Sequence, residues 1–145
     1  MYTIFEPKTK KELENYYRLR WMLLRRPWGK ERGTEIDEME HSSHHRAVKN
    51  LDDCIIGIGR IHFDRSNGQI RYMAVKKDFW RKGIGSLIIT ELESIAVKNK
   101  IKNIFLNSRE NAQTFYIKNG FKTIKRVNSS FGGITHYRME KILNY

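Results

Sequence analysis

The sequence predicts an α/β fold, built as an α+β mixed sheet with helices on both of its faces. Two observations support this prediction. Short segments of strand-like character alternate with segments whose apolar residues recur at helical spacing. Their order along the chain is a strand and a helix, several strands, two further helices each preceded by a strand, and two closing strands. With 145 residues, we expect a single domain that spans residues 1–145.

Composition excludes several classes of protein. The chain has a single cysteine, Cys54, which excludes a disulfide scaffold and a four-cysteine metal site. No apolar stretch could span a membrane and the start of the chain lacks a secretion signal, so we expect a cytoplasmic protein. The net charge of +12 fits an anionic partner, such as nucleic acid, an acidic carrier protein or a phosphorylated cofactor, and fits equally a solvated lysine-rich surface. Because no nucleic-acid-binding motif accompanies the charge, nucleic acid is not favoured.

The first strand is expected at Tyr2–Glu6, and the first helix follows it. Thr9 and Glu12 have the spacing of a capping box, in which the Thr hydroxyl accepts from a helix amide and the Glu side chain reaches back. Behind this signal, apolar residues fall at helical spacing at Leu13, Tyr17, Trp21 and Leu24.

The middle of the chain predicts a loop and then a group of strands. Residues 25–45 are polar and interrupted by glycine, which indicates a loop with a short helix. Strands are expected at Arg46–Leu51 and Cys54–Phe63, with Cys54 buried as a small apolar residue. Asn67-Gly68 is typical of a hairpin turn because both residues tolerate a positive φ, and the strand Gln69–Val75 follows it.

The second half predicts two helices and three strands. One apolar stripe extends over more than three helical turns, through Ile84, Leu87, Ile88, Leu92, Ile95 and Ala96. After a short strand at Asn103–Leu106, Asn111 is a good N-cap for a helix over Ala112–Lys118, and Gly120 is placed to end it. The closing strands and the turn between them are expected at Phe121–Val127, Gly132-Gly133 and Ile134–Ile142.

A basic loop with two glycines precedes the helix that has this apolar stripe. Gly83 and Gly85 lack side chains that would keep a ligand from the backbone, and the first amides of a helix are free donors at the positive end of its dipole. This arrangement suits a pyrophosphate, although it also fits a loop that only needs glycine. The spacing differs from that of a Walker loop and of the dinucleotide fingerprint. Four basic residues of the loop would attract an anion, namely Lys76, Lys77, Arg81 and Lys82.

Two blocks of the sequence resemble the GCN5-related N-acetyltransferase (GNAT) superfamily. Tyr72–Val75 followed by Arg81–Ser86 is similar to the family's acetyl-CoA motif, and Leu106–Phe121 is similar to its second motif. Together with the strands between and after them, the blocks cover roughly residues 55–142. The sequence departs from the family at Trp80, which stands where the motif has Gln or Arg, and Arg81 follows one step later.

A narrower resemblance is to a bacterial branch of this superfamily, some of whose members are fused to hotdog-fold thioesterases or linked to acyl-carrier metabolism. It rests on residues 20–45, on Gln69–Val75 and on Gly132–His136.

The superfamily resemblance implies a GNAT-like acyl-CoA N-acyltransferase fold, whose mostly antiparallel sheet contains one splayed parallel pair. It implies acetyl-CoA as cosubstrate, no metal, and transfer of an acetyl group to an amine of a small molecule or protein by direct attack. Dimers are common in the family, and the oligomeric state stays open here. The cofactor-binding residues that the resemblance implies are Met73, Ala74, Val75, Arg81, Lys82, Gly83, Ile84, Gly85, Ser86, Asn107 and Asn111.

The resemblance assigns Tyr116 to the family's catalytic acid. A phenol with a pKa near 10 can protonate a departing thiolate whose conjugate thiol has a pKa near 8.5. The alternative is a packed aromatic residue beside Phe115. The acceptor amine must lose a proton before it attacks, and the sequence does not identify the base. The candidates are Glu38, Glu40, His41, His44, His45, His62 and His136.

Two alternatives to the acetyltransferase stay open: a non-catalytic module that binds acetyl-CoA, and an acyltransferase that acts on acyl-carrier or thioester metabolites. An acidic cluster in the loop favours a cationic acceptor such as a polyamine, an aminoglycoside or a lysine side chain, and fits equally a solvated face. Its residues are Glu31, Glu35, Asp37, Glu38 and Glu40.

Overall fold

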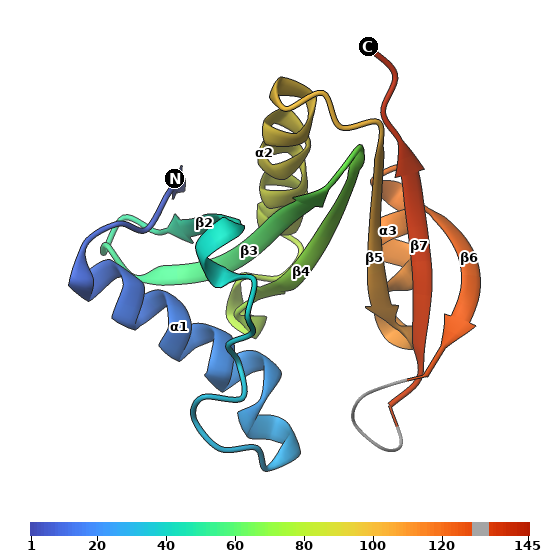
Figure 1. Ribbon diagram of the computed structural model, residues 1–145. Coiled ribbons are helices and arrows are strands. Elements are labelled where there is room, and N and C mark those ends of the chain that lie inside the picture. The colour runs from blue at the N-terminus through green and yellow to red at the C-terminus, as the bar shows by residue number, and fades with distance from the viewer. Residues whose placement is uncertain (129–133) are drawn as a thin grey trace.

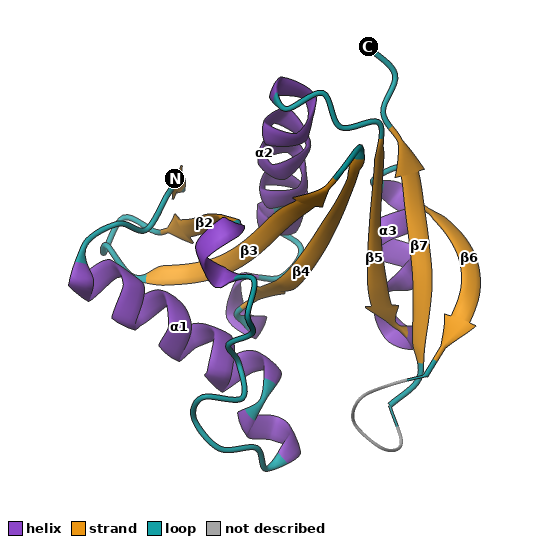
Figure 2. Cartoon of the chain, in the orientation of Figure 1, coloured by secondary structure: helices purple, strands orange, loops and turns teal. Residues whose placement is uncertain are grey.

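The computed structural model describes residues 1–128 and 134–145. Figures 1 and 2 show how the elements of these residues are arranged. The strands are β1 (Thr3–Phe5), β2 (His44–Lys49), β3 (Ile55–Asp64), β4 (Asn67–Val75), β5 (Asn103–Arg109), β6 (Lys122–Val127) and β7 (His136–Ile142). The helices are α1 (Lys10–Leu24), α2 (Ile84–Lys98) and α3 (Gln113–Lys118), with short 3-10 helices η1 (Arg26–Trp28), η2 (Glu40–Ser42), η3 (Lys77–Phe79) and η4 (Glu110–Ala112).

The strands form one sheet in the order β1-β2-β3-β4-β5-β7-β6. All neighbours are antiparallel except β4 and β5, which are parallel and are connected through α2. This confirms the predicted mostly antiparallel sheet with one parallel pair. A parallel pair needs a crossover connection, and the long helix supplies it.

The parallel pair separates soon after it forms. Only Asn67–Gln69 of β4 pairs with Asn103–Phe105 of β5. Beyond these residues β4 stays with β3 and β5 stays with β7, so the two strands diverge and leave a wedge (Figure 1). The wedge divides the sheet into a first arm, β1 to β4, and a second arm, β5 to β7.

Helices cover both faces of the sheet, as predicted (Figure 2). On one face, Tyr16 and Leu19 of α1 pack against Ala47 and Ile58 of the first arm. On the other face, α2 packs against the first arm and α3 lies behind the second (Figure 1). We call these the α1 face and the α2 face.

The predicted start of α1 is confirmed. Thr9 Oγ1 accepts from the Glu12 amide at 3.1 Å, and Glu12 Oε1 accepts from the Thr9 amide at 3.0 Å. Both partners of the capping box are therefore satisfied.

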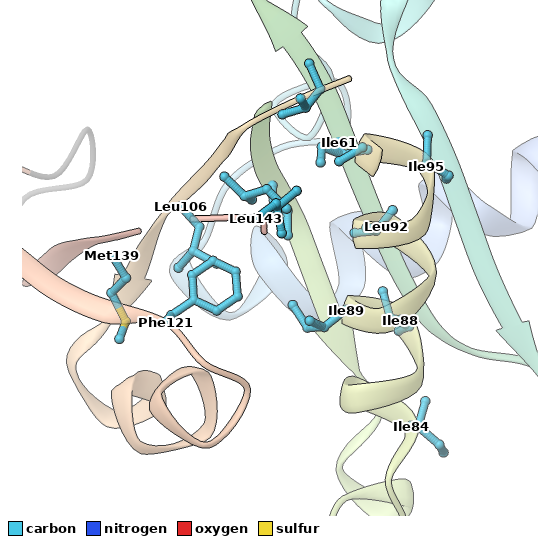
Figure 3. Packing of buried hydrophobic residues seen from close by; sticks show 14 of the residues in the cluster. Ile61, Ile84, Ile88, Ile89, Leu92, Ile95, Leu106, Phe121, Met139 and Leu143 are labelled. Carbon is cyan, nitrogen blue, oxygen red and sulfur yellow. The ribbon is translucent and has the colours of Figure 1, made fainter. Parts of the chain in front are cut away.

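The apolar stripe predicted for residues 84–96 forms the buried side of α2, except that Leu87 is exposed and Ile89, outside the stripe, is buried. Ile88 and Leu92 are fully buried in a cluster with Ile61 of β3 and Leu106 of β5 (Figure 3). The helix lies very close to β3, since a Cβ at Gly59 would be 2.6 Å from Cγ2 of Ile88. This tight packing fixes the start of α2 beside the wedge.

The predicted hairpin turn at Asn67-Gly68 is wrong. Both residues belong to β4, where Asn67 pairs with Asp64, and the turn consists of Arg65 and Ser66. Arg65 adopts the positive φ of +58° that the turn requires. Gly68 is needed for packing instead, because a Cβ there would lie 3.2 Å from Ile61 and 3.3 Å from Phe63.

Other local predictions differ at the ends of elements. Asn111 is not an N-cap: it lies in η4, and α3 begins at Gln113 without a side-chain cap. Gly120 follows α3 with φ +92°, as its predicted role in ending the helix requires. Cys54 is exposed, because it precedes β3 in a turn that Asn50 closes by accepting from the Cys54 amide. The predicted Gly132-Gly133 turn lies outside the described residues.

In the two described ranges, 1–128 and 134–145, no helix combines the length and the apolar character that a membrane crossing requires.

Candidate active site

A cleft of about 1110 Å³ occupies the wedge between the two arms. Its walls come from β4, the start of α2, the end of β5, and α3. Lys82 lies outside the lining and is exposed. The other predicted site residues all line this cleft, namely Met73, Ala74, Val75, Arg81, Gly83, Ile84, Gly85, Ser86, Asn107, Asn111 and Tyr116.

Strand β4 contains a bulge in the wall of the cleft. Ile58 of β3 pairs with Ala74, whereas Arg60 pairs with Arg71, so β4 has one residue more than β3 between these pairs. The irregularity includes Tyr72, whose φ of +56° is unusual for an aromatic residue. A bulge turns backbone groups out of the ladder, and β5 has already diverged at this point. The β4 backbone therefore has unpaired groups beside the cleft.

Arginine side chains hold the ring of Tyr72 from several directions. Four guanidinium carbons lie within 5.4 Å of the ring centroid: Arg20 at 4.2 Å, Arg71 at 4.6 Å, Arg60 at 4.9 Å and Arg25 at 5.4 Å. Such cation–π contacts stabilise the ring and offset the strain of its backbone. No pattern in the sequence predicted this arrangement.

Helix α2 begins at the cleft without a side-chain cap. Its N-cap is Gly83, at φ +80°, and its first turn contains no acidic residue. The first hydrogen bond within the helix joins the Leu87 amide to the Gly83 carbonyl at 3.0 Å. The amides of Ile84, Gly85 and Ser86 therefore have no acceptor in the helix, and the helix dipole adds partial positive charge to them. This is an anion-binding arrangement.

The two glycines of this loop have different structural roles. A Cβ at Gly83 would meet nothing within 4 Å, so this glycine is required for its positive φ. A Cβ at Gly85 would lie 2.7 Å from Cζ of Phe115, so this glycine allows α3 to approach α2. Trp80, which replaces the family's Gln or Arg, donates from Nε1 to the Val75 carbonyl at 2.7 Å and ties the loop to the end of β4.

Tyr116 is a packed aromatic residue that also lines the cleft. Its ring centroid lies 5.0 Å from that of Phe115 and 5.9 Å from that of Phe121. Burial raises the pKa of Tyr116 to about 12, although the charge of Arg109 acts in the opposite direction. The phenol therefore keeps its proton at neutral pH. It can act there as a general acid and not as a general base.

Two carboxylates of the acidic loop cluster, Asp37 and Glu40, form ion pairs inside the protein. Asp37 binds Arg60 at 2.6 and 3.0 Å and Arg71 at 2.9 Å. Glu40 binds Arg20 at 2.9 Å and Arg60 at 3.0 Å, and both of these arginine side chains are fully buried. These two carboxylates are therefore not available to a cationic acceptor, which removes much of the support for that expectation.

Of the seven candidate bases, all of which lie in described residues, His136 alone lines the cleft. Both ring nitrogens of His45 are occupied, one by the Tyr16 hydroxyl and one by the Glu40 carbonyl, each at 2.9 Å. His62 lines a separate small cavity. Burial, and then the charge of Arg109, lowers the pKa of His136, so that its imidazole is neutral at pH 7.

The fold and this site define the class of acyltransferases that use an acyl-CoA cosubstrate. Comparisons with known proteins give the family. A family model described as an acetyltransferase (GNAT) domain matches residues 30–143. The uncharacterized N-acetyltransferase YjcF of Bacillus subtilis strain 168 is 30% identical over 107 residues, which cover 74% of this chain and 76% of YjcF. The chain belongs to the GNAT acetyltransferase family and is an acyltransferase.

Solved structures of low sequence identity have the same fold. An aminoglycoside 6'-N-acetyltransferase complexed with coenzyme A has a TM-score of 0.81 at 13% identity, with 100% of this chain and 98% of that chain covered. A ribosomal-protein alanine N-acetyltransferase from Escherichia coli has a TM-score of 0.76 at 14% identity, with 100% and 96% covered. Because the acceptors in these two names differ, the shared fold does not identify the acceptor here.

Proposed function

We propose that this protein transfers the acetyl group of acetyl-CoA to an amine of a small molecule or a protein, by direct attack of the amine on the thioester. The main support is the convergence of the uncapped start of α2, the free edge of β4 and Tyr116 on one cleft. At about 1110 Å³, the cleft is large enough for an extended cosubstrate arm together with a small acceptor.

The pyrophosphate of acetyl-CoA would bind at the start of α2. The amides of Ile84, Gly85 and Ser86 would donate to its oxygens, with support from the helix dipole. Arg81 lines the cleft beside them, and the exposed Lys82 would attract the anion from outside the lining.

The pantetheine arm would lie along β4. No described strand pairs with Met73–Val75 on the side that β5 leaves, although the Val75 carbonyl accepts from Trp80 Nε1, so the amide groups of the arm can pair with the rest of this edge like an added strand. Asn107 and Asn111 would contact the arm or the adenylate from the other wall. A β4 amide freed by the bulge would stabilise the negative charge that develops on the thioester oxygen.

Two side chains would carry out the proton transfers. The phenol of Tyr116 would protonate the departing thiolate, since burial keeps it protonated. The neutral imidazole of His136 would accept the proton that the attacking amine releases, directly or through a water molecule. The amine nitrogen gains the bond to the acetyl carbon, and the thioester bond breaks to release the CoA thiol.

Free-thiol release from acetyl-CoA, measured over a broad panel of amines, tests the proposal. We expect release that depends on the amine and saturates with acetyl-CoA. Binding of acetyl-CoA without release by any amine would indicate a non-catalytic module instead. Release from acyl-carrier thioesters but not from acetyl-CoA would indicate the alternative acyltransferase.

A further inference from the structure

The lining of the cleft is cationic. Among its described residues are six Lys or Arg side chains and no Asp or Glu. The sequence of residues 129–133, which lie outside the described part, contains no acidic residue either. A site that binds a polycation needs carboxylates to compensate the charge. The charges of this cleft fit ligands that are themselves anionic.

The pyrophosphate of acetyl-CoA explains only the cations near the start of α2. Along β5, Ile104 and Leu106 point into the core beneath α2, so Arg109 projects from the opposite α1 face. Its guanidinium carbon lies 5.6 Å from the ring centroid of Trp28, which follows α1 in the chain. Arg109 is therefore on the other face of the sheet from the uncapped amides.

The α1 face of the cleft has a surplus of positive charge. Arg20, Arg60 and Arg71 around Tyr72 share only two carboxylates, Asp37 and Glu40. Arg71, which lines the cleft, is the most exposed of the three, with 42% of its side chain accessible. An incoming anion would meet Arg71 at the end of this network.

Arg109 adds a cation with no partner of opposite charge. It is half-buried, and no carboxylate of the described residues lies within ion-pair distance of it. Burial lowers the pKa of Arg109, which reflects the cost of placing its charge there. A carboxylate or phosphate would offset that cost through paired charge-assisted hydrogen bonds to the planar guanidinium.

We propose that the acceptor is a small amine that also carries an anionic group, a carboxylate or a phosphate, which Arg109 binds on the α1 face, with Arg71 of β4 as a second cation in the cleft lining. This inference rests on the proposed acetyltransferase function. The amine would then meet the thioester where the pantetheine arm passes through the wedge.

The test compares amines in matched pairs. A series of ω-amino carboxylates of increasing chain length is assayed for thiol release from acetyl-CoA, each beside its neutral amide and its phosphonate analogue, at equal concentrations of free base. We expect a kcat/KM for at least one anionic form that is about tenfold or more above that of its amide, the size of a charge-assisted contact. A comparison of the carboxylates with the phosphonates identifies which anion is preferred.

Variants assign the preference to a residue. Arg109→Gln should reduce kcat/KM about tenfold more for the anionic amine than for its amide, because any effect of the lost charge on Tyr116 and His136 is common to both amines, and Arg109→Lys should restore part of the preference. Arg81→Gln, on the other wall, should weaken acetyl-CoA equally for both amines. Arg138→Gln is the matched control: Arg138 lies next to Asn107 on β7 and outside the cleft lining, so both rates should stay unchanged.

The outcomes separate this inference from the proposed function. Thiol release with amides equal to or better than the anionic amines would overturn the anionic acceptor and leave the acetyltransferase intact. An equal loss for both forms in Arg109→Gln would also overturn it, because Arg109 would then act on acetyl-CoA, on the fold, or on the pKa values of Tyr116 and His136, and not on the anion of the acceptor. No release with any amine would remove the transferase function and this inference with it.

Discussion

Tyr72 and Tyr116 face the same cleft but do different things. The ring of Tyr72 lies among arginine side chains and fixes a bulged backbone, whereas Tyr116 is packed between aromatic rings and keeps its proton. The proposed chemistry therefore depends on one tyrosine as a structural residue and on the other as an acid.

Replacing the acid tests its role. Tyr116→Phe keeps the ring and removes the hydroxyl, so kcat should fall about a hundredfold, the lower range of general-acid catalysis, because a thiol is a good leaving group. Calorimetry should show unchanged affinity for acetyl-CoA. Tyr17→Phe is the control, since Tyr17 contacts Glu40 outside the cleft. An unaltered rate in Tyr116→Phe would contradict the assignment.

Asp37 links stability to pH. Burial alone would raise the pKa of this carboxyl, but hydrogen bonds from Arg60 and the Met39 amide, together with the charges of Arg60 and Arg71, lower it well below its ordinary value. Because the folded pKa is below the unfolded one, the stabilisation is complete above the unfolded pKa of about 3.9 and is lost as the pH falls through the folded pKa.

Asp37→Asn should therefore lower the free energy of unfolding at pH 7 by about 3–5 kcal/mol, the usual effect of breaking a buried ion pair. The difference in the free energy of unfolding between wild type and variant should become smaller below about pH 4, as denaturant titrations at several pH values would show. Glu38→Gln, at an exposed position, is the control. A gap that does not change with pH would show that charge is not the cause.

At the level of elements, the proposed binding of acetyl-CoA depends most on the first turn of α2. Its two glycines predict separable effects. Gly83→Ala forces a side chain into φ +80° in open space, so it should raise the Kd for acetyl-CoA about tenfold, with backbone strain of about 1–3 kcal/mol redirecting the amides. Gly85→Ala places a Cβ 2.7 Å from Phe115, so it should mainly reduce stability, by about 1–3 kcal/mol.

Calorimetry with acetyl-CoA and thermal unfolding distinguish the two variants. We expect Gly83→Ala to lose affinity for acetyl-CoA with only a small loss of stability. We expect Gly85→Ala to lose mainly stability. The reverse pattern would show that the amides of α2 are not the anion site.

Elements with local signals could be predicted from the sequence. The capping box of Thr9 and Glu12 and the stripe of α2 depend on residues within a few positions of each other, and both are confirmed apart from the exposed Leu87. The prediction of a turn at Asn67-Gly68 was wrong because the turn forms at Arg65 and Ser66, where Arg65 adopts the positive φ, and Gly68 is left to pack against β3 and the distant Ile101. The prediction of Asn111 as an N-cap was wrong because β5 continues to Arg109 and a 3-10 turn precedes α3.

In the molecule as a whole, the parallel pair and its cleft could be predicted only through the resemblance to GNAT enzymes, since no local pattern encodes where two strands separate. The arginine network could not be predicted, because it joins residues such as Asp37 and Arg60 that are 23 positions apart. This network is the reason that we propose an anionic acceptor and not a cationic one: Asp37 and Glu40 of the acidic loop are paired internally, and arginine side chains line the cleft.

Above all, we propose that the wedge between the two arms binds acetyl-CoA through the uncapped start of α2. Titration calorimetry of the folded protein with acetyl-CoA tests it most directly. We predict saturable binding with one site per chain, weakened by Arg81→Gln and by added salt, because charge contributes to it. The absence of binding at high micromolar acetyl-CoA would contradict the account.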